Sequence, residues 1–140
     1  MENNFDTQLA QIQTDMISSS LEYCENKADI VYIMTGNLGS FESGFQCHYG
    51  LFFRIDGMLL DFRDMATSAL QNEIMKKFSI YLNRLRKACE EHDRPIPVIM
   101  KLTYHTKNKN LEIDSSYELL NEDVVLSDIK KDWFKSLSNG

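Results

Sequence analysis

Hydrophobic residues recur at steps of three and four positions near the start of the chain and again in its middle. Over residues 5 to about 21 they form a single stripe opposite glutamines and an aspartate, which predicts an amphipathic helix. A second stripe over residues 70–88 predicts the longest helix, for which Thr67 is a suitable N-cap. Pro95 and Pro97 then end this helix and begin the next strand.

β-branched and aromatic residues occupy the segments between these helices. The stretch "ADIVYIMTG" predicts a buried strand that ends at Gly36, and the composition of "NLGSFESG" predicts a loop after it. Asp56 and Gly57 predict a tight turn between two apolar strands, with Gly50 indicating a bulge or bend in the first of them. The stretches "VIMKLTYH" and "LEIDSSYE" predict a second hairpin, joined by "TKNKN".

The end of the chain predicts one more helix, docked by the aromatic pair Trp133 and Phe134. The predicted order is therefore helix, three strands, helix, two strands, helix. Hairpins and short connections favour an α+β fold with a mostly antiparallel sheet of about five strands and helices packed on one side. The length of the chain predicts a single domain over residues 1–140.

Charge and cysteine content narrow the classes of partner and the compartment. The formal net charge of −6 disfavours nucleic acid and anionic membranes as main partners, because both attract clustered lysine and arginine. Cys24, Cys47 and Cys89 form no C-x-x-C pair, which predicts free thiols in a reducing compartment. The polar, acidic N-terminus lacks the features of a signal peptide, so we expect a cytoplasmic protein.

Carboxylates are concentrated near the C-terminus without compensating bases. Between Lys109 and Lys130 the sequence contains no lysine or arginine. A solvated acidic turn is one interpretation of this stretch. The other is a surface that speeds the encounter with a cationic partner. On the second interpretation, the predicted partner-binding residues are Glu112, Asp114, Tyr117, Glu118, Glu122, Asp123 and Asp128.

Signals for catalysis, metals and cofactors are weak in this sequence. Cys47 and His48 are adjacent on a predicted strand, so their side chains point to opposite faces and cannot form a catalytic pair alone. His92 and His105 have no metal-ligand spacing with each other or with His48. We therefore predict no catalytic residue, no metal site and no cofactor.

The C-terminal third of the chain, "RPIPVIMKLTYHTKNKNLEIDSSYELLNEDVVLSDIKKDWFKSL", resembles the YezG/EsaG-type immunity proteins. In that family a strand and a polar hairpin turn precede an "I-D-x-x-Y-E/D" segment, acidic residues and a short aromatic helix. The matching positions are Ile113, Asp114, Tyr117 and Glu118. The chain departs from the family where "PIP" replaces a usual tryptophan. The resemblance implies a non-enzymatic cytoplasmic antidote that binds a bacterial toxin domain, often a nuclease.

Two other functions fit parts of the same sequence. Type III-like secretion chaperones are also small and acidic, and they resemble this chain in the order of their elements. Such a chaperone is expected to form a dimer with apolar grooves that hold an effector segment, whereas a toxin inhibitor can act through a charged patch. An enzyme would instead need carboxylates that converge in a pocket.

Overall fold

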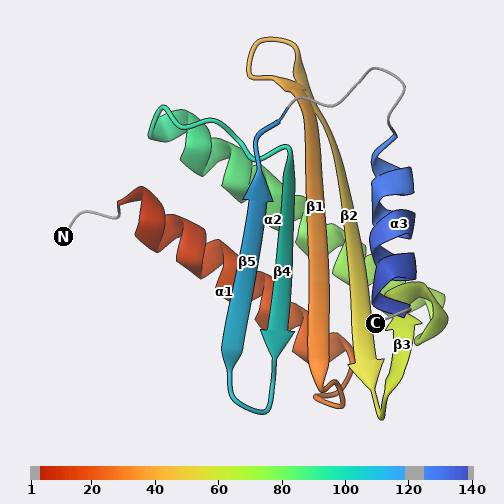
Figure 1. The fold of residues 1–140 in the computed structure, drawn as a ribbon. Helices are drawn as coiled ribbons and strands as arrows, with labels where there is room; N and C mark the ends of the chain where they lie inside the picture. The colour runs from red at the N-terminus through yellow and green to blue at the C-terminus, as the bar shows by residue number, and fades with distance from the viewer. Residues whose placement is uncertain (1–3, 119–124, 139–140) are drawn as a thin grey trace.

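The fold combines a five-stranded antiparallel sheet with three α-helices (Figure 1). The computed structural model describes residues 4–118 and 125–138. None of the helices in these ranges is both long and apolar enough to cross a bilayer. The elements follow the predicted order: α1 (Phe5–Tyr23), β1 (Ile30–Ser40), β2 (Gly44–Ile55), β3 (Met58–Asp61), the 3₁₀ turn η1 (Phe62–Asp64), α2 (Ser68–Glu91), β4 (Ile99–His105), β5 (Asn110–Ser116) and α3 (Leu126–Ser138).

The sheet has the strand order β3-β2-β1-β4-β5, with β1 in the centre. β1 and β2 pair without interruption up to Ser40 and Gly44, so the loop predicted after Gly36 is wrong. Residues 41–43 alone form the turn. The small polar residues that suggested a loop lie instead in the outer part of a long hairpin. Gly50 lies opposite Met34 in the same continuous register, so the predicted bulge is also absent.

The main core lies between the sheet and the pair α1 and α2. These two helices cover one face together, and the Arg84 guanidinium joins them through an ion pair of 2.7 Å to Asp15. The predicted stripe of α2 is buried from Ile74 to Ala88. Thr67 is its N-cap, as predicted, and accepts a hydrogen bond from the Leu70 N–H. The largest buried side chains on this face are Met16, Ile33, Leu51, Phe53, Phe78 and Leu85.

The third helix lies on the opposite face of the sheet, in front of it in Figure 1. Trp133 of α3 contacts the rings of Tyr32 and Phe52, and Phe134 also packs on Phe52. These contacts confirm the docking by the aromatic pair. The prediction that all helices pack on one side is wrong, however, because α3 buries Met34 and Phe52 on the face away from α1 and α2.

Two glycines let α3 approach the sheet closely. A methyl group built on Gly36 would lie 2.7 Å from Leu126 Cδ2, and one on Gly50 would lie 2.6 Å from Lys130 Cδ. Both distances are shorter than a normal van der Waals contact between carbon atoms. The buried side of α3 therefore packs directly on the backbone of these two glycines.

Candidate protein-binding surfaces

The acidic residues predicted from the sequence lie on and beyond an edge strand. Among the described residues, β5 pairs with β4 and with no other strand, so no described strand covers its outer edge. Leu111 packs against the main core. Because side chains alternate along a strand, Glu112 and Asp114 point to the other face, where both are exposed. The fold thus presents these two carboxylates to solvent beside an unpaired strand edge.

The two residues directly after β5 continue this exposed surface. Tyr117 is 52% exposed, and Glu118 is also exposed. Asp128 lies in the first turn of α3, where a carboxylate favours the positive end of the helix dipole. The start of α3 lies at the same end of the sheet as the end of β5 (Figure 1). Glu122 and Asp123 lie outside the described residues.

The fold places cations beside part of this surface, although the sequence contains none nearby. Lys101 of β4 lies opposite Asp114 in the register. His105 Nε2 lies 3.5 Å from a carboxylate oxygen of Glu112. Although residues 110–129 contain no lysine or arginine, the fold therefore places basic side chains of β4 next to the carboxylates of β5. Within the described ranges, Glu118 forms no ion pair.

A second surface feature lies near the other edge of the sheet, between β2 and α2. Here a groove of about 580 Å³ is open to solvent. Its apolar side chains come from the β1–β2 turn, β2, η1 and α2. The described lining residues are Phe41, Gly44, Phe45, Cys47, His48, Tyr49, Phe62, Arg63, Met75, Ser79, Leu82, Asn83, Arg86 and Lys130.

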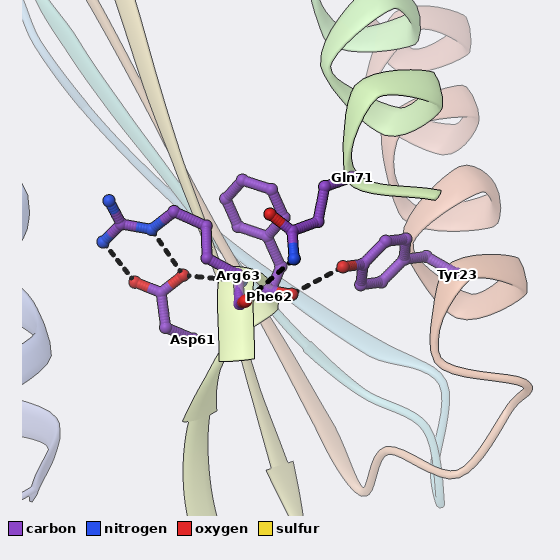
Figure 2. Close-up of polar contacts among 5 residues, drawn as sticks. All are labelled: Tyr23, Asp61, Phe62, Arg63 and Gln71. Atoms are coloured by element: carbon purple, nitrogen blue, oxygen red, sulfur yellow. Dashed lines mark hydrogen bonds and ion pairs between the residues drawn. The ribbon is translucent and has the colours of Figure 1, made fainter. Parts of the chain in front are cut away.

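The turn η1, which follows β3, contributes Phe62 and Arg63 to the lining of this groove, and Figure 2 shows the polar contacts that hold the turn. The Asp61 carboxylate is almost fully buried and accepts hydrogen bonds of 3.1 and 2.9 Å from the Arg63 guanidinium. Gln71 of α2 donates to the Arg63 carbonyl, and the Tyr23 hydroxyl donates to the Phe62 carbonyl. The turn is therefore tied to both α1 and α2. Hydrogen bonding to Asp61 raises the pKa of Arg63, which stays charged.

Lys130 enters the groove from α3 and is the least exposed lysine in the described chain, at 8%. Its stem crosses Gly50. Burial lowers the pKa of its ammonium group, and the neighbouring Arg63 lowers it further. Burial also lowers the pKa of His48, with Lys130 acting in the same direction. Among the described residues, no hydrogen bond or ion pair satisfies the Lys130 ammonium group.

The adjacent Cys47 and His48 do not act on each other in this arrangement. Cys47 Sγ donates a hydrogen bond of 3.1 Å to Asn37 Oδ1, and burial raises the pKa of this thiol. All three cysteines are free, as predicted, and Cys47 alone among them is exposed. Within the described residues, no group of three histidine, cysteine, aspartate or glutamate side chains is placed to hold a metal ion.

Sequence reasoning identified the acidic edge but missed the groove. Neither Arg63 nor Lys130 was predicted to belong to a binding site, because charged side chains usually lie in solvent. One signal was present, since Lys130 follows Leu126 by four positions and so shares its side of the helix. Comparison of the chain with models of known protein families and with curated proteins finds no match.

Proposed function

We propose that this protein is a cytoplasmic immunity protein that binds and neutralises a basic bacterial toxin domain, most simply a nuclease. The proposed contact surface consists of β5 and the residues that follow it. The observation that supports it is the exposure of Glu112 and Asp114 on β5 and of Tyr117 and Glu118 directly after it. The resemblance of the same segment to YezG/EsaG-type immunity proteins points to the same function.

The physical reason lies in what a nuclease must bind. A groove that holds a phosphate backbone is lined with lysine and arginine. Carboxylates presented on a rigid strand can take the place of phosphates there and block access by occupancy and charge. Tyr117 adds a large half-apolar ring of the kind that often anchors protein interfaces. This mode of inhibition requires no active site in the inhibitor.

The proposal predicts that a neighbouring reading frame encodes a toxin domain, and the test uses that domain. Its expression should arrest growth, and co-expression of the wild-type chain should restore growth. In the double variant Asp114→Lys and Glu118→Lys, attraction becomes repulsion, so we expect the association rate constant to fall by about tenfold or more at low salt. Stopped-flow binding at several salt concentrations measures this effect.

A matched control uses two exposed glutamates on α2. The double variant Glu73→Lys and Glu91→Lys changes the net charge by the same amount on α2, which covers the face of the sheet opposite to the one that carries Asp114. Its association rate should stay within about twofold of wild type if steering is local. Equal slowing by both double variants would mean that net charge alone matters, and unchanged kinetics in the β5 variant would contradict the proposed surface.

A type III-like secretion chaperone is the second candidate. It is favoured by the observed order of elements and by apolar side chains that α2 leaves in solvent, namely Leu70, Met75 and Ile80 at 45–57% exposure. A chaperone of this class works as a dimer. We expect the free protein to sediment as a monomer at micromolar concentration, as a charge-steered inhibitor can. A stable dimer that buries these α2 side chains would instead favour the chaperone.

A further inference from the structure

The edge of β2 is open along most of the groove, a feature that the immunity hypothesis does not use. β3 pairs with β2 over Phe52–Ile55 only. The remainder of β2, from Gly44 to Leu51, pairs with β1 on one side, and no strand of the described ranges pairs with its other side. The lining of the groove includes this uncovered part of β2. A strand edge is therefore exposed within a concave surface.

The direction of the backbone groups along this edge follows from the register. The Arg54 carbonyl accepts a hydrogen bond of 2.8 Å from Asp29 N–H and therefore points toward β1. Because these directions alternate in an antiparallel strand, the N–H and C=O groups of Phe45, Cys47 and Tyr49 point the other way, into the groove. Asn37 of β1 lies opposite Cys47, and its N–H donates to the Val98 carbonyl and not to Cys47. This is consistent with a Cys47 backbone that points away from β1.

The side chains around this edge are apolar toward α2 and cationic elsewhere. Phe45, Met75 and Leu82 provide the apolar contacts. Arg63, Arg86 and Lys130 provide the positive charge, and the described lining residues include no aspartate or glutamate. In a chain whose net charge is −6, this is a local reversal of sign. A complementary ligand carries negative charge and at least one apolar side chain.

We propose that the groove binds an extended acidic segment of a partner protein, which adds to β2 as a sixth strand in line with β3. Backbone groups of the segment would pair with those of Phe45, Cys47 and Tyr49. Its apolar side chains would face Met75 and Leu82, and its carboxylates would meet Lys130 and the neighbouring arginines.

The open strand edge is what favours a peptide over other anions. A nucleic acid or a free phosphate would meet the same cations, but neither carries the alternating N–H and C=O groups that a strand edge pairs with. This site lies at the opposite edge of the sheet from β5. A negative result for the acidic surface proposed for the toxin would therefore not contradict this site, and the reverse also holds.

The test uses the full chain and synthetic peptides of about eight residues. One peptide alternates valine with glutamate, a second replaces glutamate with lysine, and a third is the acidic peptide with all of its backbone amides N-methylated. Fluorescence anisotropy of the dye-labelled peptides reports binding. We expect the acidic peptide to bind about tenfold or more tightly than either of the others, since they lack the charge or the backbone donors.

Two matched pairs of variants locate the binding. Cys47→Pro removes a backbone donor on the open edge and leaves the pairing with β1 intact, whereas Cys47→Ala keeps the donor. Lys130→Met removes a groove charge, whereas Lys135→Met removes an exposed charge of α3. The acidic peptide should bind more weakly to the first member of each pair, by about tenfold. Circular dichroism verifies that each variant is folded.

Several results would overturn the proposal. Equal binding of the acidic and lysine peptides would remove the charge argument, and equal binding of the N-methylated peptide would remove strand addition. No binding of any peptide would contradict both. Titration with single-stranded RNA that binds more tightly than the acidic peptide would identify a nucleic-acid site instead. Concentration-dependent self-association lost in Cys47→Pro would show that the occupant is a second copy of this chain.

Discussion

Replacing Phe78 with alanine is expected to lower the free energy of unfolding by about 3–5 kcal/mol, because the phenyl ring is lost from a position that cannot collapse around the cavity. Phe78 is fully buried on α2. Its ring stacks on Tyr49 of β2 at a centroid distance of 4.6 Å and meets Tyr81 edge to face. The substitution therefore removes the main aromatic contact between α2 and the floor of the groove.

Urea denaturation followed by the fluorescence of the single tryptophan measures this loss. The control is Ile80→Ala, two positions along the same helix, where the side chain is 57% exposed. That change should stay within about 0.5 kcal/mol of wild type. Because whole domains are stable by only roughly 5–15 kcal/mol, the Phe78 variant should approach the limit of folding. Similar losses in both variants would show that the core is not where the structure places it.

Replacing Trp133 with alanine should have the second largest effect, about 2–4 kcal/mol, because its ring is only partly covered. The indole lies edge to face on Tyr32 and tilted against Phe52, with centroid distances of 5.9 Å. The Lys101 ammonium group lies 5.3 Å from the same ring. Removal should weaken the attachment of α3 and uncover the apolar face beneath it.

Far-UV circular dichroism in urea measures this change, since the variant lacks the fluorescent probe. Asp132→Ala is the matched control, because Asp132 precedes Trp133 and is exposed. Trp133→Phe should recover part of the loss, since a smaller ring keeps some of the contact. If the alanine variant were as stable as the control, α3 would not be held to the sheet by this side chain.

The helices, strands and turns could be predicted well because each depends on residues that are close together in the sequence. The turn at Asp56 and Gly57 was predicted from two residues that both adopt positive φ in the structure. The hydrophobic stripe of α2 was predicted from its spacing, and Thr67 from its position before that stripe. Periodicity shows that a helix buries one side. It does not show against which face of a sheet, so the position of α3 was missed.

The candidate site was predicted only where its residues are close together in the sequence. The acidic surface was found because Asp114, Tyr117 and Glu118 lie within five positions. Its partial neutralisation by Lys101 depends on strand register, which no short pattern reveals. The groove joins Arg63, Arg86 and Lys130 from three separate elements. Cations that converge in this way look like ordinary surface charge until the chain is folded.

The close packing of α3 against Gly36 and Gly50 limits which substitutions this chain can accept during evolution. The exposed carboxylates Asp114 and Glu118 are not part of the core, so substitutions there should change the fold little. A side chain at either glycine would instead collide with the side chain of Leu126 or Lys130, which would have to move. Descendants that keep this architecture should therefore retain both glycines even where their binding residues differ. In an alignment of homologues, the columns of these two glycines should be more strongly conserved than the columns of the exposed carboxylates.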